Sequence, residues 1–323
     1  MSAINSGVQK AETYTPRPAK QKSFWRKCVE QRQLLVLIVP FLCLVFVFHY
    51  LPLWGWLMAF QNFKPAKGIF GSVFVGLANF QELFADANFY RAFKNTVATS
   101  ALKIVFNFFS AILLALMLNE VRRIAFKRVV QTISYLPYFV SWVVAANIVY
   151  MTLSPNDGIL NVLLMKLGLS QEGIPFMGEP KYFYWIIALS NVWKNVGWNA
   201  IIYLASMTGI DPELYEAASI DGAGRLRRIM AVTLPSIFPI IKILLVLNIG
   251  MLMNAGFEHV YLLSNPSNFE ASRTIEVYVF TYALKTGRLS YGTAIGIFNS
   301  TISISLILIS NWISKRIDGY GIF

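Results

Sequence analysis

Residues 211–235 read DPELYEAASIDGAGRLRRIMAVTLP, a polar stretch between two long apolar runs. Asp211 is a residue type that caps helix N-termini, and Pro212 fits the first helical position. The two glutamates that follow favour the positive end of a helix, and Gly222 can end the helix in a left-handed turn. The pattern predicts a short helix from Pro212 to Asp221, a glycine turn and a second helix.

The rest of the chain is unusually apolar. Of its 323 residues, 56% are hydrophobic and only 14% are charged, which is outside the balance of a soluble domain. An apolar helix needs about 20 residues to cross the hydrocarbon core of a bilayer. We therefore predict an all-α polytopic membrane protein with six spans: Leu34 to Leu57, Asn95 to Leu118, Val129 to Leu153, Phe183 to Met207, Ile237 to Leu263 and Tyr291 to Ile313.

Basic residues predict the orientation of these spans. Sixteen of the 28 Lys and Arg fall in the two terminal segments and in the loops after spans two and four, nine fall on the opposite side, and three lie within spans. Since cytoplasmic loops are enriched in Lys and Arg, both termini are predicted to be cytoplasmic. The same rule explains the formal charge of +12 without a nucleic-acid partner.

These boundaries give three parts. Residues 1–33 form a basic cytoplasmic tail that is expected to be largely disordered, with an interfacial part. Residues 34–314 form the transmembrane domain, which includes the polar loop 207–235, and residues 315–323 form a cytoplasmic C-terminus. The outer loop from Gln61 to Lys94 contains many phenylalanines, so we expect short interfacial helices there.

The polar loop resembles the permeases of binding-protein-dependent ABC importers. Their pattern is Glu-Ala-Ala, three residues, Gly, nine residues, Ile, one residue and Leu-Pro, and Val232 replaces the Ile here. Segments from about Leu35 to the C-terminus resemble the sugar branch of the family, in particular permeases for complex oligosaccharides or uronate-containing polysaccharide fragments. The residues that match the coupling pattern, or set its turn, are Glu216, Ala217, Ala218, Asp221, Gly222, Leu234 and Pro235.

The resemblance implies a place in a bacterial inner membrane and a set of partners. The two-helix projection would dock in a groove of a separate ATPase subunit, with Glu216 as the main contact. Two ATPase subunits would bind ATP and magnesium, and a second, related permease and an extracytoplasmic solute-binding protein would complete the importer of a glycan. No Gly-x-x-x-x-Gly-Lys-Ser/Thr loop occurs in the chain, so this subunit is predicted to bind no cofactor and to hydrolyse no ATP.

Polar residues inside spans are candidates for the substrate path, because burying them in a bilayer is expensive. Amides and carboxylates can bond sugar hydroxyls, indole faces can stack on pyranose rings, and a lysine could meet a uronate. The candidates are Asn191, Trp193, Lys194, Asn195, Trp198, Asn199, Asn254 and Glu258. For the asparagines the structural alternative is interhelical hydrogen bonding, for the lysine it is snorkelling, and for the tryptophans it is ordinary packing.

Helical spacing predicts two shared polar faces. Asn191, Asn195 and Asn199 recur every fourth residue in span four, and Asn254 and Glu258 lie one turn apart in span five.

Three alternatives remain open for the function. The first is a permease of the same superfamily for a non-sugar solute such as a polyamine or phosphate. The second is a stand-alone channel or ion-coupled carrier, which would leave the patterned loop unexplained. The third is an intramembrane enzyme, against which the two distant histidines and the lack of a catalytic motif count.

Overall fold

The computed structural model describes residues 30–318, most of which are helical. The predicted disordered tail lies almost wholly outside the described residues. Contacts divide the chain into two units, Met1–Trp54 and Gly55–Phe323. In the first unit, helix α2 (Arg32–Val45) buries none of its side chains and continues into a π-helical turn, Phe46–Tyr50.

The second unit contains nearly all the remaining elements. Its start overlaps a 3₁₀ run, Leu51–Phe60, that begins in the first unit. The helices that follow are α3 (Gly68–Gly71), α4 (Ala78–Ala85), α5 (Ala87–Glu120), α6 (Ile124–Tyr135), α7 (Trp142–Leu153), α8 (Ile159–Lys166), α9 (Pro180–Thr208), α10 (Pro212–Ile220), α11 (Arg225–Arg228), α12 (Leu234–Gly250), α13 (Phe257–Leu263), α14 (Phe269–Ser272), α15 (Ile275–Tyr278) and α16 (Leu289–Asp318). Further 3₁₀ turns occupy Pro65–Lys67 and Leu136–Phe139, and π-helical segments occupy Ile229–Thr233 and Val279–Leu284.

The predicted outer loop holds more than short helices. Helices α3 and α4 lie there as expected, but β1 (Gln61–Asn62) and β2 (Val73–Phe74) also form an antiparallel pair. Gln61 pairs with Phe74, and Asn62 pairs with Val73. Two paired residues per strand are too few for a sequence pattern to reveal.

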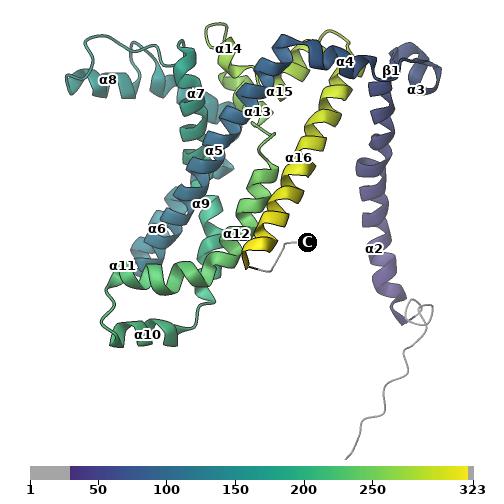
Figure 1. The fold of residues 1–323 in the computed structure, drawn as a ribbon. Coiled ribbons are helices and arrows are strands. Elements are labelled where there is room, and N and C mark those ends of the chain that lie inside the picture. The colour runs from purple at the N-terminus through teal and green to yellow at the C-terminus, as the bar shows by residue number, and fades with distance from the viewer. Residues whose placement is uncertain (1–29, 319–323) are drawn as a thin grey trace, which may run out of the picture. The chain divides into compact units, whose positions relative to one another are not determined.

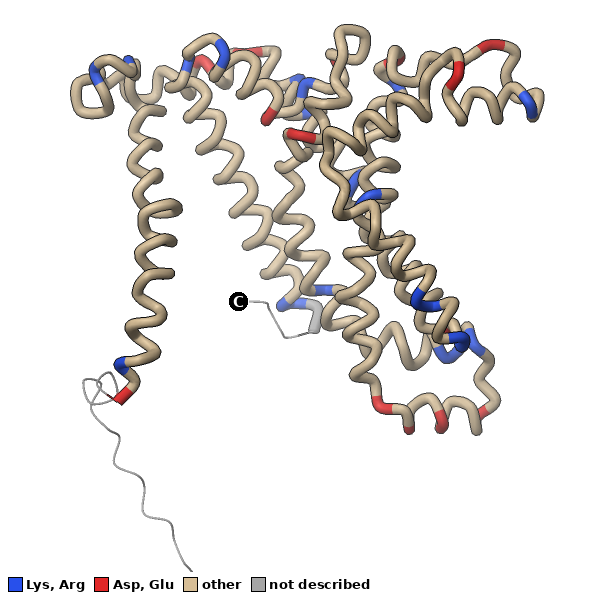
Figure 2. The backbone as a smooth tube through the Cα atoms, turned by 180° about the vertical axis from the view of Figure 1, so that it is seen from behind, with Lys and Arg blue, Asp and Glu red and all other residues tan. Residues whose placement is uncertain are grey.

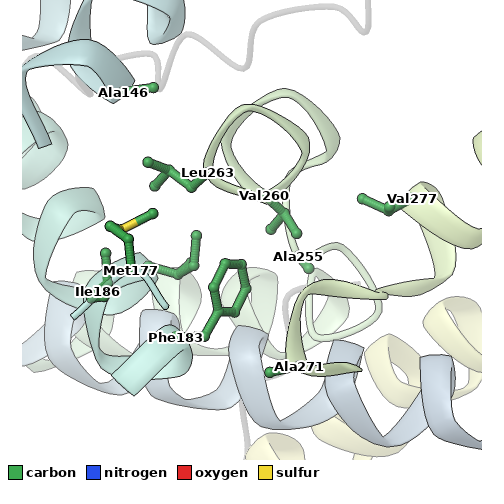
Figure 3. Packing of buried hydrophobic residues seen from close by; sticks show 10 residues of the cluster. Ala146, Met177, Phe183, Ile186, Ala255, Val260, Leu263, Ala271 and Val277 are labelled. Atoms are coloured by element: carbon green, nitrogen blue, oxygen red, sulfur yellow. The ribbon is translucent and has the colours of Figure 1, made fainter. Parts of the chain in front are cut away.

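Helices α5 and α9 form the centre of the second unit and lie side by side, with α6 against α9 and α12 against α16 (Figure 1). Small residues at the contact, Ala111 and Ala115 of α5 and Ala200 of α9, are fully buried and let the two backbones approach closely. Nearby, Val260 and Leu263 of α13 gather with side chains of α9 in a second apolar cluster (Figure 3).

Four helical runs within residues 30–318 are long and apolar enough to cross a membrane: Arg32–Phe60, Ala87–Glu120, Arg225–Gly250 and Leu289–Arg316. A fifth candidate, Ile124–Phe139 with Trp142–Leu153, is bent by 105°. Helix α9, which holds the predicted fourth span, has 29 residues but is not among these runs. Its amides and its lysines reduce the apolar character that the other runs have.

Two predicted spans are not the continuous helices that the sequence suggested. The run Val129 to Leu153 breaks after the 3₁₀ turn that contains Pro137, since proline cannot continue the ladder of helical hydrogen bonds. The run Ile237 to Leu263 was also wrong as one helix, because α12 ends at Gly250 and α13 begins only at Phe257. Gly256, with φ +91°, lies in this second break.

Candidate functional site

The projection between α9 and α12 has the predicted form. The Asp211 carboxylate accepts a hydrogen bond from the backbone N–H of Glu213 at 3.0 Å, and Pro212 opens α10. Gly222 has φ +73°, a left-handed conformation that residues with a Cβ rarely adopt. The predicted helix-turn-helix geometry is therefore present, with α10 one residue shorter than expected.

Two side-chain contacts hold α10 to the segment that follows it. The Tyr215 hydroxyl lies 3.0 Å from the Thr233 hydroxyl, and Arg228 donates to the Ser219 hydroxyl at 3.1 Å. Thr233 is fully buried, so the first contact anchors the exposed helix to the bundle. A force on α10 would thus pass to the base of α12.

The second helix of the projection is continuous with α12. The sequence placed a boundary near Pro235, but the helical run extends from Arg225 to Gly250 through the π-helical segment Ile229–Thr233. Pro235 has no N–H to donate, and it lies in the first turn of α12, where the ladder changes from π to α. Helices α11 and α12 thus form one helical rod, to which α10 is joined by the Gly222 turn.

Exposed groups on the projection suit a protein partner. Glu216 and Asp221 are exposed, as are the apolar side chains of Ile220, Leu226 and Met230, which retain 87%, 77% and 71% of their accessible surface. Large exposed apolar side chains close together mark interaction sites. Among the matched motif residues, Ala218 and Leu234 are half-buried and Ala217 and Pro235 are exposed.

The three asparagines of α9 share one seam, as predicted, with a fourth asparagine from α5. Asn107 donates to the Asn191 side chain at 2.9 Å and accepts from Asn199 at 3.0 Å. Asn195 donates to the backbone carbonyl of Asn191 at 3.1 Å. Sequence reasoning missed Asn107, although an amide within an apolar span was the available signal.

A small cavity lies at one end of this seam. It has a volume of about 80 Å³, and Asn107, Asn199, Tyr203 and Asn248 are among its lining residues. Three amides and one phenol around such a cavity can exchange hydrogen bonds with water or with a hydroxyl group. Two of these side chains come from α9 and the others from α5 and α12, so the cavity joins three helices.

Lys194 bonds backbone groups of its own chain. Its Nζ donates to the backbone carbonyls of Val140 at 2.6 Å, Tyr138 at 2.7 Å and Pro137 at 3.3 Å. The residue retains 5% of its accessible surface. The ammonium group therefore serves the break between α6 and α7 in this structure. A contact with a uronate stays a prediction and would have to compete with these hydrogen bonds.

Lys103 of α5 bonds the backbone carbonyls at the break between α12 and α13. Its Nζ donates to the backbone carbonyls of Asn254 at 2.9 Å and Ala255 at 3.0 Å. The Glu276 carboxylate accepts from the backbone N–H of Ala255 at 2.9 Å. The sequence placed Lys103 inside a span but not in the site.

Asn254 and Glu258 do not share a helical face. Asn254 lies in the break after α12, whereas Glu258 lies in the first turn of α13, so the four-residue spacing that suggested one polar face does not apply. Both side chains are exposed, and Glu258 attracts Lys194 electrostatically.

The two tryptophans have different surroundings. Trp198 stacks on Tyr138 with ring centroids 4.4 Å apart, so one indole face is occupied. Trp193 lines an apolar cavity of about 440 Å³ between α7, α8 and α9. The stack on Tyr138 is ordinary packing for Trp198, and sugar stacking on either indole stays a prediction.

Comparison with known proteins decides the family. Residues 107–319 match the family described as binding-protein-dependent transport system inner membrane component. The chain belongs to this family. The family's members are inner-membrane ABC permease components, which agrees with several apolar helices long enough to span a membrane.

Two relatives from Bacillus subtilis (strain 168) match most of the chain. The polygalacturonan/rhamnogalacturonan transport system permease protein YteP is 41% identical over 304 residues, which are 94% of each chain. Protein LplB is 39% identical over 290 residues, 90% of this chain and 91% of LplB.

A solved structure agrees with this family. It is a crystal structure of a bacterial ABC transporter involved in the import of the acidic polysaccharide alginate. One of its chains matches with a TM-score of 0.83 and 37% identity over 91% of this chain and 99% of that chain.

Proposed function

We propose that this chain is the membrane-spanning permease subunit of an ATP-driven importer for an oligosaccharide or polysaccharide fragment. The observation that carries the proposal is the capped α10 joined by the Gly222 turn to a rigid rod that continues as a span. The polysaccharide cargo of YteP and of the alginate transporter supports the glycan over a polyamine or phosphate.

The chain crosses the membrane six times in this proposal. The spans are the α2 run, α5, the bent pair α6 and α7, α9, the rod that ends in α12, and α16. An even number puts both termini on one side, which the excess of Lys and Arg makes the cytoplasmic side. The projection that contains α10 then lies in the cytoplasm.

The partner ATPase would act on α10. Glu216 and the exposed apolar residues of the projection would contact a groove of that subunit. Since Tyr215 and Thr233 connect α10 to the base of α12, closure of an ATPase dimer would tilt the rod as a rigid body. ATP and magnesium would bind the two ATPase subunits, and this chain would have no enzymatic activity.

The glycan would pass along the amide seam. Asn107 already bonds both Asn191 and Asn199, so a sugar hydroxyl would exchange with one of these bonds rather than meet an unpaired group. Within residues 30–318 the side-chain oxygens of Asn195, Asn254 and Glu258 accept no hydrogen bond, and Asn254 and Glu258 are exposed. The acidic character of the cargo is supported by the relatives alone, because Lys194 is engaged.

A reconstituted system would test this function. The chain would be combined with its ATPase, a second permease and a binding protein, and ATP hydrolysis would be measured with neutral oligosaccharides, uronate oligosaccharides, spermidine and phosphate. We expect stimulation by a glycan only. Stimulation by spermidine or phosphate instead would refute the glycan cargo, and hydrolysis indifferent to all four would refute the importer.

A further inference from the structure

An arginine pocket lies where α5 ends and α6 begins. Its volume is about 400 Å³, and it is lined by Arg122 and Arg123 of the connecting loop, Arg225 of α11, Glu120, and the apolar side chains of Met117 and Phe126, with Val121. Figure 2 shows Lys and Arg gathered at this end of the second unit, whereas the carboxylates gather along α10.

The three guanidinium groups have unused hydrogen-bond capacity. Among residues 30–318, no side-chain hydrogen bond or ion pair involves Arg122, Arg123 or Arg225, and all three are exposed. With Glu120 the pocket has an excess of two positive charges. Arginine is the side chain best suited to bind phosphate oxygens, because its planar fork can donate two parallel hydrogen bonds.

Two apolar stripes reach this pocket. On α5, Phe109, Leu113 and Met117 lie four residues apart and are each more than half exposed. On α6, Phe126, Val129 and Ile133 lie three and four residues apart and are also each more than half exposed. Met117 and Phe126, the end members of the two stripes, line the pocket itself.

The pocket also lies at the end of a candidate membrane span, where lipid headgroups would be found. The run Ala87–Glu120 is long and apolar enough to cross a membrane, and Arg122 and Arg123 follow its last residue almost directly. A basic pocket at the end of a span, with apolar surface leading away from it along two helices, matches a phospholipid in charge and in shape.

We propose that this pocket binds the phosphate of an anionic phospholipid, with the acyl chains along the two stripes. An acidic surface of a soluble partner would account for the arginines but would leave the stripes uncovered. A neighbouring membrane subunit would cover the stripes but would not need the arginines. A phospholipid accounts for both features.

Native mass spectrometry of the full-length chain in detergent would test the proposal, with phosphatidylglycerol compared with phosphatidylethanolamine. We expect the wild type to prefer phosphatidylglycerol. Arg225→Ala should weaken its binding about fivefold, and Arg122→Ala with Arg123→Ala should weaken it further. Arg227→Ala is the matched control, because Arg227 lies on the same short helix but does not line the pocket.

Three results would overturn the proposal. The first is equal loss of phosphatidylglycerol in Arg225→Ala and Arg227→Ala, which would indicate diffuse charge. The second is displacement of the lipid from the wild type by inorganic phosphate at equal concentration, which would indicate a soluble anion site. The third is a loss of phosphatidylglycerol from the wild type when the ATPase binds, if this loss is as large as the loss caused by Arg122→Ala with Arg123→Ala. That result would assign the arginines to the interface with the ATPase.

Discussion

The Nζ of Lys194 lies 2.6 Å from the backbone carbonyl oxygen of Val140, so a lysine of α9 holds the start of α7. Lys103 of α5 does the same for the carbonyls that precede α13. Each break in a span leaves carbonyl groups without helical partners, and in an apolar environment such groups must be satisfied by other donors. The paired central helices α5 and α9 supply both lysines, and thereby position both broken helices.

Replacing Lys194 by methionine should therefore destabilise the chain. Three half-buried carbonyls would lose their donor, and we expect the unfolding free energy to fall by about 3 kcal/mol. Lys166→Met is the matched control, because Lys166 is exposed and its side chain makes no hydrogen bond in the described part of the chain. Denaturation of the two purified variants would measure the difference. Equal stability of the two would show that the lysine does not hold the break.

Gly222 gives the sharpest test of the projection. A valine at φ +73° would be strained by about 1–3 kcal/mol and should displace α10. We expect Gly222→Val to abolish glycan uptake while the chain still inserts into the membrane. Gly224→Val should retain uptake, because Gly224 has φ −65° and a Cβ there would meet nothing within 4 Å. Similar uptake by both variants would remove the turn from the mechanism.

Glu216→Lys tests the contact with the ATPase separately. Because Glu216 is exposed, a lysine side chain can take its place without moving neighbouring residues, and the fold should persist. Charge reversal should lower co-purification of the ATPase and transport together. Glu213→Lys is the control, because it also reverses a negative charge at the start of the same helix. If Glu213→Lys had the larger effect, Glu213 and not Glu216 would be the main contact with the ATPase.

The amide seam predicts coupling between two helices. Asn107→Leu and Asn199→Leu each remove one side of the 3.0 Å bond, and each leaves the other side unpaired. A double-mutant cycle on the unfolding free energy should give an interaction of about 0.5–1.5 kcal/mol. If the seam also carries the glycan, each variant should raise the KM for uptake, whereas Asn119→Leu, on α5 but outside the seam, should not.

Asp86, which precedes α5, should make the stability of the chain depend on pH. Burial alone would raise the pKa of its carboxyl group, but hydrogen bonds from the hydroxyls of Tyr278 and Tyr291 and from the backbone of Asn88 outweigh burial and lower it below 3.8. A lowered pKa contributes stability that is present above pH 3.8 and is lost as the pH falls through the lowered value.

The Asp86→Asn variant should thus be less stable than the wild type at pH 7, and this difference in stability should become smaller toward pH 3. Thermal unfolding at both pH values would measure the difference. A difference in stability that is the same at both pH values would mean that the charge of Asp86 contributes nothing to stability.

The sequence predicted the projection well, because Asp211, Pro212 and Gly222 act through local backbone chemistry that needs no tertiary context. It also predicted that the asparagines of α9 share a face, since their spacing matches one helical repeat. The length of the apolar runs predicted several of the long apolar helices, because about 20 such residues in a row are needed to cross a bilayer.

The broken helices could not be predicted in this way. Hydropathy does not distinguish one span from two helices joined by a bend, and a break depends on donors such as Lys103 and Lys194 that come from distant parts of the chain. Lys194 was therefore assigned to a substrate, and Asn254 and Glu258 were assigned to one helix. Asn107 was missed because its partners lie 84 and 92 residues away.

Uptake of a labelled uronate oligosaccharide into proteoliposomes tests the central claim most directly. The vesicles would contain this chain, the second permease and the ATPase, with binding protein outside and ATP inside. We predict uptake that requires ATP and that is lost in Gly222→Val but not in Gly224→Val. Uptake by this chain alone, without the ATPase or ATP, would contradict the account.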